Sequence, residues 1–253
     1  MSVRQTFLFD EGPNGASPAV SGDLIESSGM TYTTSGKHGA FGLIGSALGS
    51  QFIGINNSGT VNHSGSLYVK PTTQVDGSNR VLNINTSTNT VIFAIRINSN
   101  GHFQLVRGST AVNDTVFSWV ANQWYRIDWQ YDQTTLAAPI MTVRFFTNPD
   151  GTVPDETYSS TQSAVPSNMS KWRMGLISNS TVSATTTIDT FRVADGLEWI
   201  GPYVSRNGKG KVWDSASSTW VPFTPKPYVS GAPVTAKAKV WDAASGTWKT
   251  TNS

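Results

Sequence analysis

The chain contains no cysteine among its 253 residues. This absence excludes disulfide bonds, thiolate nucleophiles and cysteine-based zinc sites, so we expect a protein stabilised by packing alone. Charged residues are also scarce, at 13% of the chain, against roughly 25% in an average soluble domain. Ser, Thr, Asn and Gly supply the polarity instead, which suits sheet surfaces and turns and disfavours helices.

Long apolar runs are missing as well. No stretch approaches the roughly 18 apolar residues that cross a bilayer, and the opening MSVRQTFLFDEG has no apolar segment of the kind found in signal peptides. The net charge is +2, and the basic residues are scattered apart from RNGKGK (206–211), which we expect to be a solvated linker. We therefore expect a protein made in a cytoplasm, with neither a nucleic-acid nor a membrane partner.

Several segments alternate apolar and polar residues with the period of two that is typical of strands. They are VIFAIRI (91–97), WYRIDWQYD (124–132), MTVRFF (141–146) and KWRMGLIS (171–178). In the second of these, one face carries Tyr125, Ile127, Trp129 and Tyr131. No segment shows a convincing helical stripe, and turn residues stand between the runs. The pattern predicts an all-β protein with two antiparallel sheets packed face to face.

Four segments resemble landmarks of concanavalin A/laminin-G-like jelly-roll domains, which occur in virion proteins of tailed bacteriophages, especially phages of actinobacteria. They are FLFDEGPNG (7–15), KHGAFGL (37–43), NQWYRIDWQYD (122–132) and TIDTFRVADGLEWIGPY (187–203). The resemblance implies a concanavalin A-like jelly-roll sandwich over residues 1–203. It also implies a non-enzymatic virion structural or adhesion protein. A minor tail protein is the expected type, with a capsid decoration or head-fibre protein as an alternative.

Residues 204–253 contain a duplicated segment. KVWDSASSTW (211–220) recurs as KVWDAASGTW (239–248), an offset of 28 residues from Lys211 to Lys239. That degree of identity in register marks a repeat. We predict a linker followed by two β-hairpins, at 211–223 and 239–251, each with a four-residue loop. The spacing opposes Trp213 to Trp220 and Trp241 to Trp248. The two repeated segments resemble segments at the ends of phage minor tail proteins.

A lone two-stranded hairpin is marginally stable in water, so these repeats need a surface to pack on. Their tryptophans could hold small hairpins on the main domain, anchor a protein interface or stack on sugars. We therefore take Trp213, Trp220, Trp241 and Trp248 as candidate partner- or glycan-binding residues. Trp124 is added because its strand face also carries Arg126, Asp128 and Gln130, although it could equally cover a sheet edge or pack under a loop.

The sequence offers no catalytic constellation. His38, His63 and His102 stand in turn-like contexts without a metal-ligand or triad spacing, and we expect them on the surface or in loops. Glycoside hydrolysis needs two carboxylates across the scissile bond. Asp155 and Glu156 are neighbours that would face opposite ways on a strand, and Asp128 and Asp132 have the wrong spacing, so we expect these carboxylates to be solvated. We predict no catalytic residue, with a polysaccharide-degrading enzyme as an alternative.

A structural cation is the one cofactor that the resemblance suggests. Related sugar-binding jelly rolls hold calcium near positions that match Asp10, Glu11 and Asp189, but Thr190 stands where those domains have a second Asp. Asp189 is otherwise expected to be a strand-end hydrogen-bond acceptor. We expect no cofactor, with one calcium ion near these three residues as the alternative.

These expectations combine into a virion protein that is assembled in the host cytoplasm. It would be present as a homo-oligomer or in several copies per particle, in contact with other virion proteins and with host-surface polysaccharide. Weak glycan contacts become useful when they are multivalent. The remaining alternative is a free carbohydrate-binding module.

Overall fold

A computed structural model of the chain shows strands joined by turns and loops, and divides into two units, Met1–Val204 and Ser205–Ser253. It describes residues 3–7, 9, 14–20, 23–38, 42–45, 51–56, 62–72, 79–98, 100–163, 168–177, 185–203, 210–214, 219–223, 239–242 and 247–250. No helix occurs among these residues. It follows that none of them belongs to a helix that could span a membrane.

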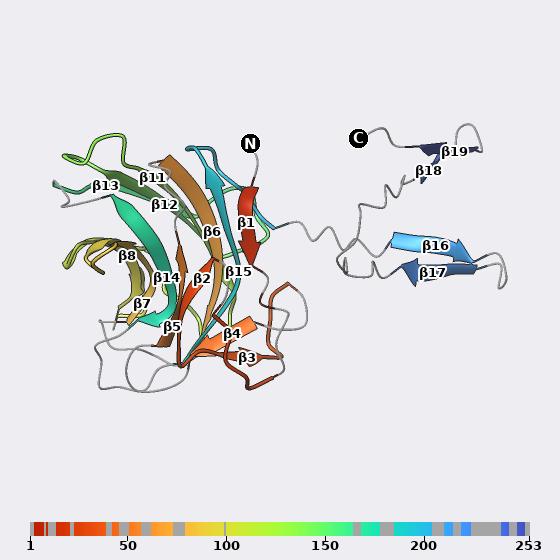
Figure 1. The fold of residues 1–253 in the computed structure, drawn as a ribbon, viewed down its shortest axis with the longest axis horizontal. Coiled ribbons are helices and arrows are strands. Elements are labelled where there is room, and N and C mark those ends of the chain that lie inside the picture. Colours follow the sequence, from red (N-terminus) through yellow and green to blue (C-terminus); the bar gives the residue numbers. More distant parts are fainter. Residues whose placement is uncertain are drawn as a thin grey trace. The chain divides into compact units, whose positions relative to one another are not determined.

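Two antiparallel sheets form the first unit (Figure 1). The eight-stranded sheet has the order β13 (Glu156–Thr161), β12 (Ile140–Phe146), β11 (Tyr125–Asp132), β6 (Asn62–Pro71), β15 (Thr186–Asp195), β4 (Gly42–Gly45) and β3 (Thr31–Thr33), with β1 (Val3–Phe7) also paired to β15. The seven-stranded sheet has the order β10 (Thr110–Asp114), β9 (Phe103–Arg107), β8 (Val91–Ile97), β7 (Asn79–Thr86), β14 (Met169–Ile177), β5 (Gln51–Asn56) and β2 (Leu24–Ser28).

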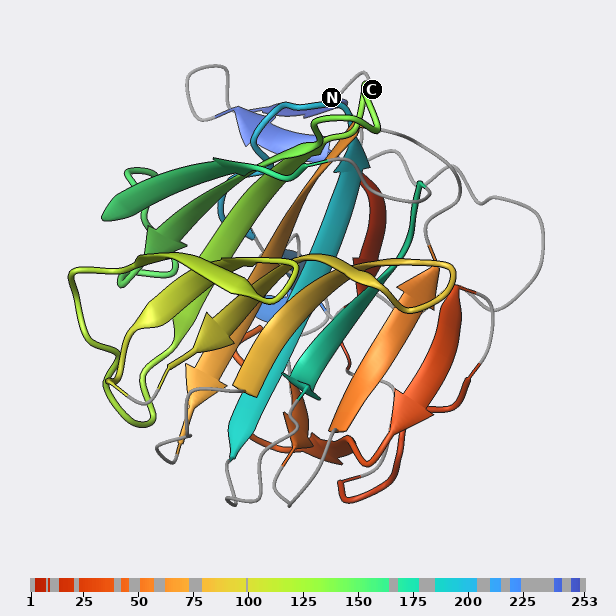
Figure 2. The ribbon, with the colours of Figure 1, turned by 90° about the vertical axis from the view of Figure 1, so that its left-hand side faces the viewer.

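Strands that are distant in sequence lie side by side in both sheets. β15 pairs with β6 along one edge, and with β4 and β1 along the other. β14 lies between β7 and β5. Figure 2, viewed from the side of β7 and β8, shows the seven-stranded sheet in front of the eight-stranded one. The predicted concanavalin A-like jelly-roll sandwich of two antiparallel sheets is confirmed.

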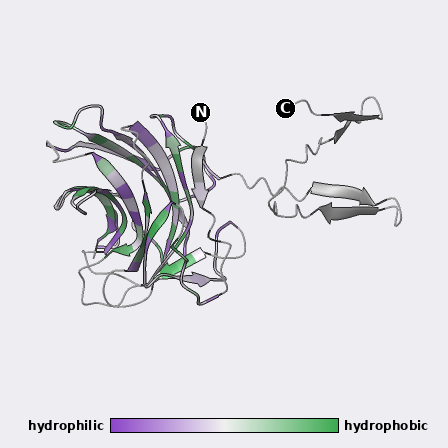
Figure 3. Cartoon of the chain, viewed as in Figure 1, coloured by the Kyte–Doolittle hydropathy of each residue, from purple (hydrophilic) through white to green (hydrophobic). Residues whose placement is uncertain are grey.

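The alternation along the strands decides which side chains form the core, and Figure 3 shows hydrophilic and hydrophobic residues interleaved along both sheets. The face of β11 that was predicted to be apolar is wholly in the core. The alternating apolar residues of the two later segments are in the core as well, namely Met141, Val143 and Phe145 of β12 and Trp172, Met174 and Leu176 of β14. On β8 the outcome differs, because Ile92 is also buried in the core while Val91 is half-buried. A register shift between the pairs of Ile84 and Asn85 disturbs the alternation there.

The centre of the core is a close fit between an indole and a glycine. Trp129 on β11 lies opposite Gly65 on β6, and a Cβ atom added at Gly65 would lie 2.0 Å from the Trp129 ring. The indole stacks on Phe191 of β15 at a centroid distance of 5.6 Å. Phe191 also contacts Trp172 of β14, in the opposite sheet, at 5.9 Å. Only glycine leaves room for this arrangement at position 65.

The second unit contains two separate hairpins. β16 (Gly210–Asp214) pairs with β17 (Thr219–Phe223), and β18 (Lys239–Asp242) pairs with β19 (Thr247–Thr250). The register places Trp213 opposite Trp220 and Trp241 opposite Trp248, as the repeat spacing predicts.

Replacing Gly65 by Ala should destabilise the fold by about 1–3 kcal/mol, because the added methyl group overpacks against Trp129. Urea unfolding of wild type and variant measures the loss. The matched comparison is a double-mutant cycle with Trp129→Phe, whose smaller ring should make the second substitution less costly. Additive effects of the two changes would contradict the fit.

Candidate functional site

The outer face of the eight-stranded sheet is covered by residues 196–203, which follow β15 and are called the covering segment below. Gln130 of β11 donates a side-chain hydrogen bond to the Leu197 carbonyl. The Arg144 guanidinium of β12 lies 3.8 Å from the centroid of the Trp199 ring, which is a cation–π contact. The first half of the covering segment therefore lies over β11 and β12.

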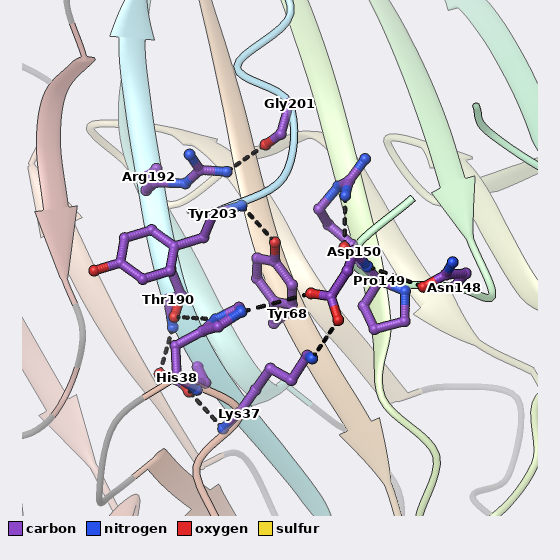
Figure 4. A network of polar contacts seen from close by, with 12 residues as sticks. Lys37, His38, Tyr68, Asn148, Pro149, Asp150, Thr190, Arg192, Gly201 and Tyr203 are labelled. Atoms are coloured by element: carbon purple, nitrogen blue, oxygen red, sulfur yellow. Dashed lines mark hydrogen bonds and ion pairs between the residues drawn. The ribbon is translucent and has the colours of Figure 1, made fainter. Parts of the chain in front are cut away.

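The second half returns over β15 and β6. The Arg192 guanidinium donates to the Gly201 carbonyl, and the Tyr203 backbone N–H donates to the Tyr68 hydroxyl at 2.7 Å (Figure 4). Arg192 also lies 5.6 Å from the Tyr203 ring centroid. Residues 199–203, the WIGPY part of the landmark, therefore cover part of this face of the sheet.

Two charged residues lie buried on the same face. The Arg126 Nε is 3.1 Å from the Asp128 Oδ1, and the two side chains are 1% and 2% exposed. Arg126 also donates to the Pro149 carbonyl at 2.5 Å and lies 3.7 Å from the Phe146 ring centroid. Burial raises the pKa of Asp128 to about 6, and the charge of Arg126 opposes this rise.

This burial corrects two expectations. Asp128 was expected to be solvated, and Arg126 and Asp128 were considered as glycan-contacting types; both lie instead inside a closed ion pair. The alternation placed them correctly on the face opposite the core. Contacts from Phe146 and from the Pro149 carbonyl, which the alternation does not reveal, help to enclose Arg126.

Asp189 holds the loop at residues 37–38 against β15. Its Oδ2 accepts the backbone N–H groups of Lys37 and His38 at 2.6 and 2.7 Å, and its Oδ1 accepts that of Thr190 at 2.6 Å. Burial raises the pKa of Asp189 to about 7, and these N–H donors oppose the rise. Asp189 is thus a hydrogen-bond acceptor, but it lies at a bulge inside β15, before Arg192, and not at the strand end.

The donors around Asp189 do not require a cation. Within the described ranges, no three His, Asp or Glu side chains gather as metal ligands do. Asp10 and Glu11, the other two residues of the calcium alternative, lie outside the described residues.

His38 sits in a cluster of aromatic and charged groups beside this loop (Figure 4). Its ring Nδ1 is 2.9 Å from the Thr190 hydroxyl, and its Nε2 is 3.8 Å from Asp150. The ring also meets Tyr68 edge-on at 4.4 Å. The pKa of His38 is lowered to about 4, mainly by burial and also by the charge of Lys37, while Asp150 opposes the shift. The ring is therefore neutral at pH 7.

His63 corrects the expectation that all three histidines lie on the surface or in loops. It lies within β6 and is wholly buried. Its ring is 5.0 Å from those of Tyr131 and Trp172, so it is part of the aromatic core. His102 lies in a turn as expected, with its Nδ1 3.0 Å from the Phe117 carbonyl.

The carboxylates at Asp155 and Glu156 serve as hydrogen-bond acceptors for loops. Asp155 accepts from the Thr147 backbone N–H at 2.6 Å. Glu156 accepts from the backbone N–H groups of Val116 and Phe117, at 2.8 and 3.1 Å. Each has a structural role that explains its position.

The outer face of the seven-stranded sheet carries a different set of polar groups. Lys171 and Arg173 alternate with the core residues of β14 and point outward. Glu26 of β2 binds both cations, with its Oε1 2.5 Å from the Lys171 Nζ and its Oε2 2.6 Å from the Arg173 Nε. The hydrogen bond from Arg173 lowers the pKa of Glu26.

Gly54 of β5 makes this bridge possible. It lies between Glu26 and Arg173 in the sheet register, and a Cβ atom there would be 2.6 Å from the Glu26 Oε2. Because Gly54 has no side chain, the glutamate lies flat across β5 and reaches β14.

Asn83 and Asn85 of β7 continue the same face. They pair in register with Arg173 and Lys171, and they are 2% and 0% exposed. Neither polar atom of the Asn85 side chain, nor the Asn83 side-chain oxygen, has a hydrogen-bond partner in the structure. Such unpaired buried groups are rare and costly, at about 1–3 kcal/mol each. Lys171 and Arg173, the register partners of these amides, are called the cationic rim below.

On the other side of Asn83 the face ends in a polar chain, meaning a row of side chains joined by hydrogen bonds. Arg96 of β8 donates to the side chain of Gln104 on β9, which donates to Asp114 on β10. Arg80 of β7 lies directly opposite Arg96. The outer polar face is defined here as Glu26, Arg80, Asn83, Asn85, Arg96, Gln104, Asp114, Lys171 and Arg173.

No family model matches the chain, and no curated protein matches its sequence. Solved structures match it in fold. The endo-β-1,4-glucuronan lyase from the fungus Trichoderma reesei has a TM-score of 0.54 and 10% identity, over 77% of this chain and 96% of the lyase. Domain 4 of AbnA, a GH43 extracellular arabinanase from Geobacillus stearothermophilus solved with arabinotriose, has a TM-score of 0.50 and 18% identity, over 77% and 93%. The shared feature is the jelly-roll sandwich.

Of the tryptophans named from the sequence, Trp124 is the one whose side chain the structure describes. Trp124 directly precedes β11, in the other sheet, where it is half-buried and its ring centroid lies 5.0 Å from the Lys70 Nζ. The hairpin tryptophans form the two opposed pairs already given, and their side chains lie outside the described residues.

Sequence reasoning missed the outer polar face. A usable signal was present in part, because Lys171, Arg173 and Arg96 alternate with predicted core residues. Glu26 and Asn83 lie in segments with no marked alternation, and only the strand order brings them to the same face.

The neutral state of buried His38 should make the fold sensitive to acid. Since the folded pKa of about 4 is below the ordinary value of 6.5, the unfolded chain binds a proton first, and stability falls as the pH drops from about 6.5 to 4. Urea unfolding at pH 7 and pH 4.5 should show the stability advantage of wild type over His38→Asn shrinking at the lower pH. A constant difference between the two proteins would contradict this.

Proposed function

We propose that the chain is a non-enzymatic glycan-binding attachment protein, and that the glycan binds to the outer polar face of the seven-stranded sheet. The observation that carries the proposal is the pair of buried, unpaired amides at Asn83 and Asn85 between the cationic rim and the polar chain. These amides lie on the outer face of the seven-stranded sheet, in register with Arg173 and Lys171, and no described residue hydrogen-bonds to the Asn83 side-chain oxygen or to either polar atom of the Asn85 side chain.

The chemistry of this face suits a sugar. An Asn side chain both donates and accepts hydrogen bonds, and the hydroxyl groups of a sugar do the same. Arg173 and Lys171 add further donors, already held in place by Glu26. The Phe52 ring, 4.6 Å from the Arg173 guanidinium, adds the kind of apolar surface on which the C–H face of a sugar ring packs.

The solved structures of similar fold support the same class of ligand. The lyase is named for a β-1,4-glucuronan, and the arabinanase domain was solved with arabinotriose. The outer face of this chain has ion pairs and amides at its centre. Its acidic members, Glu26 and Asp114, are engaged by Lys171, Arg173 and Gln104, which supports binding without cleavage.

The biological setting of this binding is proposed from the sequence. The phage resemblance over residues 3–203 and the tandem Trp-bracketed repeats support a virion protein of a tailed bacteriophage, a minor tail protein above all. We place it in several copies per particle, held by other virion proteins and directed at host-surface polysaccharide. Multiple copies would convert weak glycan contacts into firm attachment.

Replacing Asn83 and Asn85 together by Ala should weaken glycan binding by at least about tenfold, because several hydrogen bonds to the sugar are lost. The measurement is binding of the full chain to a polysaccharide array, followed by calorimetry with the polymers bound. Thermal unfolding should show no loss of stability, because the amides that are removed have no partner in the chain.

Asn79→Ala is the matched control. Asn79 is also buried with both amide atoms unpaired, but it lies opposite Ile97 and so belongs to the core side of β7. It should leave glycan binding unchanged. Equal glycan affinity of the wild type and the double variant would contradict the proposed site. Release of shortened products from a bound polysaccharide would overturn the non-enzymatic part.

Deleting residues 204–253 should remove the protein from phage particles if the hairpin repeats are the assembly anchor. Mass spectrometry of purified particles measures the copies retained. The Asn83→Ala, Asn85→Ala variant is the control and should assemble normally. Normal incorporation of the truncated chain would show that the jelly-roll unit is the anchor, contrary to this expectation.

A further inference from the structure

Arg80 and Arg96 form a pair of like charges on the outer polar face. They are direct register partners on the neighbouring strands β7 and β8. Arg96 points outward because it stands between the core residues Ile95 and Ile97, and its guanidinium donates to Gln104, which also faces outward. Both arginines are half-buried.

Neither arginine forms an ion pair with a carboxylate in the part of the chain that the structure describes. Arg96 donates to the neutral amide of Gln104, so that the charge of Asp114 reaches it only through a second hydrogen bond. Among the described residues, none forms an ion pair with Arg80. Burial lowers the pKa of Arg80, and the charge of Arg96 lowers it further. Like charges directly opposite each other destabilise a sheet, so the pair needs another reason to be there.

The other two cations of the face share one carboxylate. Lys171 and Arg173 both bind Glu26, whereas Arg80 and Arg96 keep their charge available. The two groups belong to one continuous surface, since Asn83 pairs with Arg173 on one side and with Ala94 on the other. Arg96 is two residues beyond Ala94, which is about 7 Å along the strand.

We propose that Arg80 and Arg96 bind an anionic group of an acidic polysaccharide, a carboxylate or a sulfate, next to the amides that bind its hydroxyl groups. The inference rests on the proposed glycan binding and adds the class of glycan. Two guanidinium groups offer planar forks of N–H donors that match such oxyanions in geometry as well as charge. A bound anion removes the repulsion between the two arginines, which makes the face selective for charged polymers over neutral ones.

The test compares dextran sulfate and polygalacturonate with uncharged dextran, using the full chain and calorimetry at low and at moderate salt. Wild type should bind at least one acidic polymer about tenfold or more tightly than dextran, and added salt should weaken that binding. The sulfate and carboxylate arms identify which oxyanion is preferred.

Arg80→Gln and Arg96→Gln should each lower affinity for the acidic polymer by about tenfold, with no loss in melting temperature. Arg107→Gln is the matched control, because it removes the same charge on the adjacent strand while its guanidinium points to the Thr161 carbonyl in the other sheet. Arg80→Lys and Arg96→Lys keep the positive charge but not the planar guanidinium, so each should lower the affinity by less than the Gln variant. These two variants also provide the test if a Gln variant folds poorly.

Equal affinity of wild type for dextran and for the acidic polymers would overturn the inference while leaving glycan binding intact. The inference would also be overturned if Arg80→Gln and Arg96→Gln bound the acidic polymer with the same affinity as Arg107→Gln. Failure of wild type to bind any glycan, charged or neutral, would instead overturn the proposed function together with this inference.

Discussion

The fit of the Trp129 indole over Gly65 is the contact on which the rest of the sandwich depends. It lies at the centre of the eight-stranded sheet and joins Phe191, which in turn reaches Trp172 of the opposite sheet. This chain of contacts joins the two sheets through the middle of the core, where protein side chains pack closely.

The two outer faces use charge in opposite ways. On the outer face of the eight-stranded sheet, Arg126 is paired with Asp128 and Asp189 accepts backbone N–H groups, so these three buried charges have partners within the chain. Burying a charge is tolerable only on those terms. On the seven-stranded sheet, unpaired amides and an arginine pair remain. The contrast supports a structural role for the first face and a binding role for the second.

The hairpin repeats add a different kind of surface. Each is a minimal ladder with one opposed pair of tryptophans, and a ladder of this size gains most of its stability from what it packs against. In the function proposed above, the jelly-roll unit binds the glycan and the hairpin repeats bind a protein partner.

The sequence by itself determined the strand alternation, the apolar faces of β11, β12 and β14, and the opposed tryptophans of the repeats. These depend on periods of two and on loop length, which are local properties. It did not reveal that His63 is in the core, that Arg126 and Asp128 are enclosed, or that Glu26 meets Arg173. Those outcomes depend on which distant strands become neighbours and on where the chain returns after β15. Burial and charge pairing are properties of that tertiary arrangement, so only the folded structure decided them.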